Sequence, residues 1–135
     1  MNKLKYATLA TLFAAGIANA STPCDGFKIE VQNNLPFDMA IHKIHLDGAE
    51  IQPGTIHQLN QKSEETFTVN KSVDNGVMKG EIILNTISLP SKKVHISFNL
   101  VNSGDTCVAT DVSNEVDLTL TKSFPEGKIH YEISQ

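Results

Sequence analysis

The sequence has 135 residues, of which 40% are hydrophobic and 19% charged, and its formal net charge at pH 7 is -4. This length predicts one domain, and the composition excludes collagen-like, low-complexity and strongly disordered chains. All 11 basic residues are Lys and 15 residues are acidic, so the chain lacks the clustered Arg and Lys of nucleic-acid-binding proteins. No nucleic-acid partner is therefore expected.

The first twenty residues contain the three parts of a secretory signal peptide. Lys3 and Lys5 form a positive start, residues 6–17 are apolar and uncharged, and Ala18-Asn19-Ala20 is a small-x-small cleavage site. The apolar run is shorter than the about 20 residues of a membrane helix, so no membrane span is expected. We predict cleavage after Ala20 and export to a bacterial periplasm or out of the cell. Loss of both lysines gives the mature chain a net charge of -6.

Two cysteines, Cys24 and Cys107, remain after the predicted cleavage. Cysteines in an oxidising compartment are usually paired, and two cysteines allow only one intramolecular disulfide. This bridge closes a loop of about 80 residues and contributes on the order of 4 kcal/mol in the chain-entropy model. The spacing differs from C-x-x-C and no His is adjacent to either Cys, which disfavours a redox pair or a shared metal site.

Apolar and polar residues alternate with a period of two through most of the mature chain, which indicates half-buried β-strands. In chain order the expected strands cover residues 27–32, 39–46, 66–70, 78–87, 94–100, 107–112, 116–121 and 129–134. Within residues 39–46 the alternation slips by one position near His42-Lys43. A β-bulge at this point would return the apolar side chains to the core.

These eight short strands are separated by turns rich in Gly, Pro and Asn, and no segment has the pattern of an amphipathic helix. Each strand has one apolar face, so a second sheet has to cover it. We therefore predict an all-β fold, an antiparallel two-layer β-sandwich that is Ig-like or jelly-roll-like and has one disulfide. No repeat or linker divides residues 21–135, which we expect to form a single domain.

The histidines are candidate metal ligands, because imidazole and thioether groups suit copper or zinc. Met39, His42 and His45 form the closest group, but His42 and His45 point to opposite faces of a regular strand, so only a bulge can bring them together. His95 and His130 can meet only if their strands are neighbours. Exposed strand histidines without a metal are the favoured interpretation, so no cofactor is predicted.

The sequence has no motif for nucleophilic catalysis, such as G-x-S-x-G, that would set a Ser against a His and an acid. Both cysteines are expected in the disulfide, and the adjacent Glu64-Glu65 pair is typical of a solvated rim. We predict no catalytic residues and therefore no enzyme. A small secreted hydrolase is kept as an alternative.

Loops and strand edges are the remaining routes by which a β-sandwich contacts a partner. The candidate loops are residues 33–38, 46–55, 70–77 and 102–106. The most distinctive segment, residues 46–54, offers Asp47, Glu50 and Gln52 as binding candidates, although most such segments are ordinary connectors. The leading hypothesis is an exported non-catalytic module that binds a protein or cell-surface ligand. The alternative is periplasmic metal binding through Met39, His42 and His45.

Overall fold

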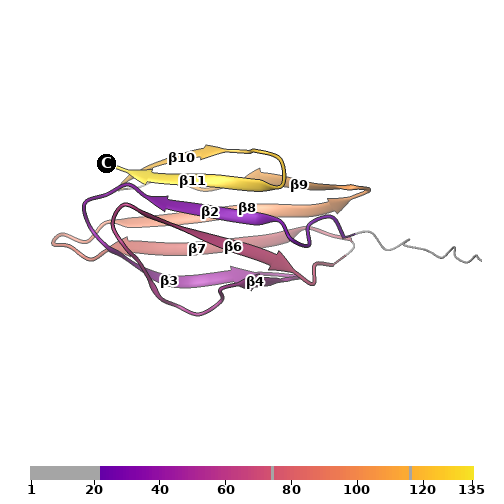
Figure 1. Ribbon diagram of the computed structural model, residues 1–135, viewed down its shortest axis with the longest axis horizontal. Coiled ribbons are helices and arrows are strands. Elements are labelled where there is room, and N and C mark those ends of the chain that lie inside the picture. The colour runs from indigo at the N-terminus through magenta and orange to yellow at the C-terminus, as the bar shows by residue number, and fades with distance from the viewer. Residues whose placement is uncertain (1–21, 74, 116) are drawn as a thin grey trace, which may run out of the picture.

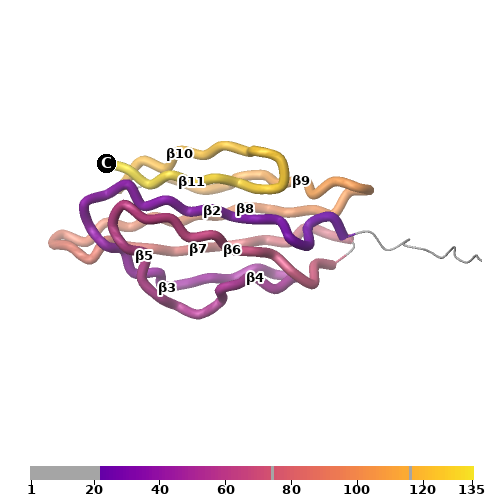
Figure 2. Tube along the Cα trace, viewed as in Figure 1, coloured from indigo at the N-terminus to yellow at the C-terminus, as the bar shows by residue number. Residues whose placement is uncertain are grey.

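The computed structural model describes residues 22–73, 75–115 and 117–135. The predicted signal peptide, residues 1–20, lies outside the described residues, as does Val116 at the start of one predicted strand. The described chain is all-β and forms two five-stranded sheets that pack face to face (Figure 1 and Figure 2). The predicted two-layer β-sandwich is confirmed. No helix long and apolar enough to cross a membrane occurs in the described ranges.

The two sheets are named by their position in Figure 1, where one lies nearer the viewer. The front sheet has the order β10 (Thr119–Ser123), β11 (Lys128–Ser134), β2 (Lys28–Asn33), β6 (Ser63–Asn70) and β4 (Glu50–Gln52). The back sheet has the order β5 (Gln58–Leu59), β3 (Met39–Leu46), β7 (Met78–Thr86), β8 (Lys93–Ser103) and β9 (Thr106–Asp111). Neighbouring strands are antiparallel except β11 and β2, which are parallel. The last strand therefore lies beside the first and runs in the same direction.

The strand pattern agrees with the sequence in its main features and differs in detail. The predicted bulge is present, because the register of β3 against β7 shifts between Ile41 and Lys43. The described residues form ten strands instead of the eight that we expected. The additional strands β4 and β5 have three and two residues, and segments this short cannot display alternation.

The core lies between the sheets and consists mainly of Ile, Leu, Val and a few aromatic side chains. The largest fully buried side chains include those of Tyr131, Phe67 and Phe98. Gly80 lies opposite Phe98 in the β7–β8 pair. A Cβ atom at Gly80 would lie 2.2 Å from Cζ of Phe98, so only glycine leaves room for this ring.

Asp111 connects the two sheets at the side where β9 and β10 form the sheet edges. Its Oδ1 accepts hydrogen bonds from Tyr131 Oη (2.8 Å) and Ser113 Oγ (2.6 Å), and Lys122 Nζ lies 2.8 Å from its Oδ2. Burial raises the pKa of this carboxyl, but the hydrogen bonds from Lys122, Ser113 and Tyr131 outweigh it and lower the pKa. Burial also raises the pKa of the Tyr131 hydroxyl. The charged carboxylate therefore stabilises the closed sandwich.

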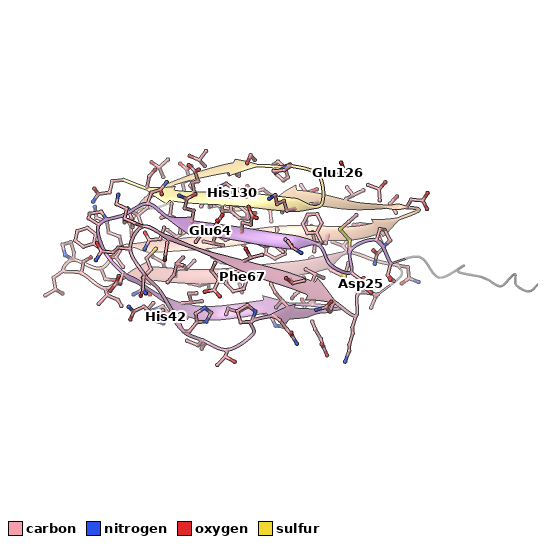
Figure 3. The ribbon with its side chains drawn as sticks, in the orientation of Figure 1. Asp25, His42, Glu64, Phe67, Glu126 and His130 are labelled. Atoms are coloured by element: carbon pink, nitrogen blue, oxygen red, sulfur yellow. A yellow bond between two sulfur atoms is a disulfide. The ribbon has the colours of Figure 1, made fainter. Side chains whose placement is uncertain are left out.

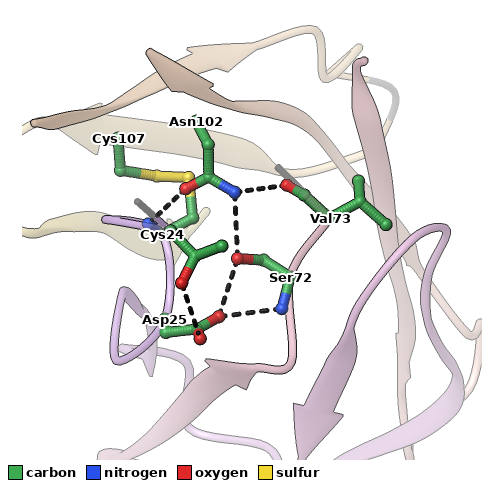
Figure 4. Close-up of a disulfide and its surroundings, with 7 residues drawn as sticks. Cys24, Asp25, Ser72, Val73, Asn102 and Cys107 are labelled. Atoms are coloured by element: carbon green, nitrogen blue, oxygen red, sulfur yellow. Dashed lines mark hydrogen bonds between the residues drawn. A yellow bond between two sulfur atoms is a disulfide. The ribbon is translucent and has the colours of Figure 1, made fainter. Parts of the chain in front are cut away.

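The predicted disulfide between Cys24 and Cys107 is present and joins the segment before β2 to β9 (Figure 4). The buried backbone N–H of Cys24 donates to Oδ1 of Asn102 at 2.6 Å. Nδ2 of Asn102 donates to Oγ of Ser72 at 3.0 Å, and this hydroxyl donates to Asp25 at 2.7 Å. Hydrogen bonds from Ser72 lower the pKa of Asp25. The N-terminal segment is thus fixed to both sheets at one end of the sandwich.

Candidate functional site

The group Met39, His42 and His45 does not gather around one point. Met39 is fully buried in the core, whereas His42 and His45 are exposed on the other side of β3. Figure 3 labels His42 on this strand. His45 instead pairs with Asp47, with 2.6 Å between Nε2 and Oδ1. The bulge is therefore present, but it does not bring the three candidate ligands together.

The three loop candidates lie along one edge and one end of the sandwich. Asp47 is in the turn between β3 and β4, where its backbone N–H donates to the carbonyl of Lys79 at 2.9 Å. Glu50 and Gln52 are exposed residues of the edge strand β4, and Glu50 pairs with Lys71 at 3.3 Å. Asp47 also lines an open groove of about 280 Å³. Their role in binding stays a prediction.

His95 and His130 do not meet, because their strands belong to different sheets. His95 on β8 contacts Glu81 of the neighbouring β7, and Lys43 Nζ approaches the same carboxylate at 2.6 Å. The hydrogen bond from Lys43 is the main cause of the lowered pKa of Glu81. His130 on β11 instead faces outward from the front sheet.

Around His130 the front sheet carries a set of charged side chains that we call the front-face cluster: Glu30, Glu64, Lys128, His130 and Glu132. Glu30 and His130 are register partners in β2 and β11, and Glu64 comes from the next strand, β6. Alternation points all five side chains away from the core. Figure 3 labels Glu64 and His130 on this face.

The imidazole of His130 has carboxylates at both of its nitrogens. Nδ1 lies 2.9 Å from Oε1 of Glu30 and 3.3 Å from Oε2 of Glu64, while Nε2 lies 3.4 Å from Oε2 of Glu132. Nζ of Lys128 lies 3.0 Å from the second carboxylate oxygen of Glu30. Sequence reasoning identified His130 only as an exposed strand residue. Its partners Glu30 and Glu64 were missed, because they lie far from it in the sequence.

These contacts determine the protonation of the cluster. Burial lowers the pKa of His130, but hydrogen bonds to Glu30 and Glu132 and the charge of Glu64 outweigh it and raise the pKa. Hydrogen bonds from His130 and then Lys128 lower the pKa of Glu30. The carboxylates of Glu30 and Glu64 therefore favour the protonated, positively charged form of His130.

A second feature is an apolar surface at the end of the sandwich opposite the disulfide, which we call the apolar end: Phe37, Ile87 and Leu89. The side chain of Leu89 is 100% exposed, Ile87 is 54% exposed and Phe37 is 37% exposed. Phe37 and Leu89 line a pocket of about 160 Å³. The loop between β7 and β8 projects past the sheets at the left of Figure 1.

Hydrogen bonds hold this loop in place. The buried Thr86 donates its backbone N–H to the carbonyl of Lys92, and its Oγ1 accepts from the N–H of Lys92, both at 2.8 Å. Ser91 Oγ donates to the Thr86 carbonyl at 2.9 Å. The N–H of Ile87 donates to the carbonyl of Asp38 in the adjacent loop at 2.8 Å. Leu89 is thus presented on an ordered support.

The adjacent loop, which carries Phe37, is fixed by the fully buried Asn33. Its Nδ2 donates to the carbonyl of Phe37 at 2.9 Å, and its Oδ1 accepts from the N–H of Leu35 at 2.9 Å. Residues 33–38 were among the loops predicted from the sequence, but the β7–β8 loop was not. The available signal was an apolar Leu89 between Ser88 and Pro90, where turns usually carry polar residues.

No family model and no curated protein matches this chain. The structure defines a class, an all-β sandwich domain with one disulfide. Its two candidate sites are the front-face cluster and the apolar end. Function is inferred from the chemistry of these residues, because a sandwich fold hosts many unrelated functions.

Proposed function

We propose that this protein is an exported, non-catalytic module that binds a protein or a cell-surface ligand through its apolar end. The observation that carries the proposal is the full exposure of Leu89 beside Ile87 and Phe37. Burying apolar surface releases about 25 cal/mol per Å², and exposed groups of apolar side chains commonly mark interaction sites. A partner that covers these three side chains would gain this energy.

The ordered loops support this proposal. A loop already fixed by the hydrogen bonds of Thr86 loses little conformational entropy when a partner binds. The neighbouring pocket of about 160 Å³ is smaller than the roughly 300–1,000 Å³ of typical small-molecule sites. These properties favour a macromolecular surface over an enclosed small ligand.

Export is supported by two independent features. A disulfide between Cys24 and Cys107 is typical of oxidising compartments outside the cytosol. The predicted signal peptide, with cleavage after Ala20, would direct the chain into the secretory pathway. The proposed lack of catalysis rests on the missing nucleophile motifs in the sequence.

Affinity capture with a matched pair of variants tests the proposal. The disulfide-bonded protein, its Leu89→Ser variant and a Val77→Ser variant are immobilised and exposed to periplasmic extract and culture medium of the source organism. Val77 is 55% exposed and lies just before β7, at the other end of the sandwich. We expect quantitative mass spectrometry to find a partner that Leu89→Ser captures at least tenfold less and Val77→Ser captures normally. Equal capture by all three proteins, or no saturable partner, contradicts the proposal.

A further inference from the structure

The front-face cluster offers three metal-binding atoms from three adjacent strands. Nδ1 of His130, a carboxylate oxygen of Glu30 and one of Glu64 all lie within 4.8 Å of one another. Ligand atoms bound tetrahedrally to Zn²⁺ at about 2.0–2.1 Å lie about 3.3 Å apart. The Nδ1–oxygen distances of 2.9 and 3.3 Å are close to this value. The two carboxylate oxygens lie within 4.8 Å of each other, so an ion that replaces the proton on Nδ1 would contact all three atoms once the carboxylates move toward it.

The surrounding contacts match those that orient ligands at metal sites. A metal-bound His usually donates its other ring N–H to a carboxylate, which fixes the tautomer and the ring orientation. Glu132 lies at Nε2 of His130, opposite the nitrogen that faces Glu30 and Glu64. Lys128 holds the second oxygen of Glu30 and leaves the first free to face Nδ1. His130 and Glu30 thus each have a neighbouring charged side chain that orients the ligand atom.

Charge and rigidity also favour a dication. With a neutral imidazole, the three carboxylates and the ammonium of Lys128 leave two negative charges. The ligands sit on β11, β2 and β6, the three central strands of the front sheet, and not on loops. We propose that Glu30, Glu64 and His130 form a binding site for a divalent transition-metal ion such as Zn²⁺, with one coordination position left for water or a further ligand.

The other histidines with carboxylate partners lack this arrangement. Among the described residues, His95 pairs with the single carboxylate of Glu81, His57 with that of Glu65 and His45 with that of Asp47. Glu30, Glu64 and His130 are the one group of three His, Cys, Asp or Glu ligand atoms found within the described ranges of the chain. His95 is therefore a matched control, since it contacts one carboxylate on the other sheet.

Calorimetric titration with Zn²⁺ at pH 7.5 in a non-coordinating buffer tests the site. The samples are the chelator-treated, disulfide-bonded protein and its His130→Asn, Glu64→Gln, Glu132→Gln and His95→Asn variants, each checked for its fold by circular dichroism. We expect one Zn²⁺ per chain in the unmodified protein. Glu132→Gln should weaken binding about 10–100-fold, as is usual for residues that orient a ligand. His130→Asn and Glu64→Gln should weaken it at least as much, and His95→Asn should bind normally.

Nitrogen NMR of the unmodified protein provides a readout that needs no substitution. Zn²⁺ should shift the Nδ1 signal of His130 and leave the ring signals of His42 and His45 unchanged. The site is refuted by the absence of saturable one-to-one binding, by normal binding in His130→Asn, or by an unperturbed His130 ring. The proposal is independent of the apolar end, so a negative result here leaves the capture experiment with Leu89→Ser unaffected.

Discussion

The Cys24–Cys107 disulfide joins residues 83 positions apart, so its removal frees most of the described chain in the unfolded state. In the chain-entropy model a closed loop of this length contributes about 4.5 kcal/mol to the free energy of unfolding. Small domains have a net stability of about 5–15 kcal/mol, so this loss is a large fraction of the total. We expect the double variant Cys24→Ala/Cys107→Ala to lose about 3–5 kcal/mol.

Urea unfolding followed by far-ultraviolet circular dichroism measures this loss. With an m-value of about 2 kcal/mol/M, the midpoint should fall by about 2 M. Alanine at both positions avoids a free thiol, and mass spectrometry of the unmodified protein first confirms the link. Val108→Ala, at an exposed neighbour of Cys107, is the control and should change stability by less than about 0.5 kcal/mol.

A loss below about 1 kcal/mol would refute the entropic reasoning. It would mean that the unfolded chain is already restricted without the bridge, or that other contacts limit unfolding. The hydrogen bonds of Asn102 to Cys24 and Ser72 hold the same segment, so Asn102→Ala separates these contributions. That variant keeps the bridge and should lose about 1–3 kcal/mol, because the buried N–H of Cys24 is left unpaired.

Three further predictions concern the closed sandwich and its loops. The pKa of Asp111 lies below its ordinary value of 3.8 in the folded protein, so its stabilising effect is complete above that value and is lost as pH falls through the folded pKa. Asp111→Asn, which weakens the contact with Lys122, should therefore flatten the acid limb of a stability–pH profile, and an unchanged limb contradicts this. Gly80→Ala should cost about 1–3 kcal/mol in urea unfolding through overlap with Phe98, whereas an unchanged midpoint would show that the ring can move. Asn33→Ala should cost about 1–3 kcal/mol by leaving buried backbone groups unpaired, and should reduce partner capture at the apolar end.

The strands could be predicted because alternation is a local property of the chain. Even the bulge near His42 is visible as a slip in the phase of apolar residues. The parallel pairing of β11 with β2 is not local, since it depends on which end of the sandwich the chain reaches before its last strand. Nothing in residues 128–134 alone distinguishes a parallel from an antiparallel neighbour.

The candidate sites, like the strand pairing, could be predicted from the sequence only where they depend on local patterns. Alternation correctly predicts that His130 points outward, but its carboxylate partners Glu30 and Glu64 come from strands paired across the sheet. Met39, His42 and His45 are close in sequence, but Met39 is buried in the core whereas both histidines are exposed on the other side of β3. Proximity along the chain therefore does not bring these three side chains together, whereas the register of the front sheet determines which carboxylates surround His130.

The two proposed sites use different parts of the fold because they would need different properties. A metal ion requires ligand atoms placed to within a fraction of an ångström, and paired central strands such as β2, β6 and β11 hold side chains most rigidly. A partner surface requires apolar area that water can reach, which the core-facing sides of the strands cannot offer. Leu89 meets that requirement because a loop carries it past the sheet ends. Since no contact described above is shared between the two sites, changes at one should leave the other intact.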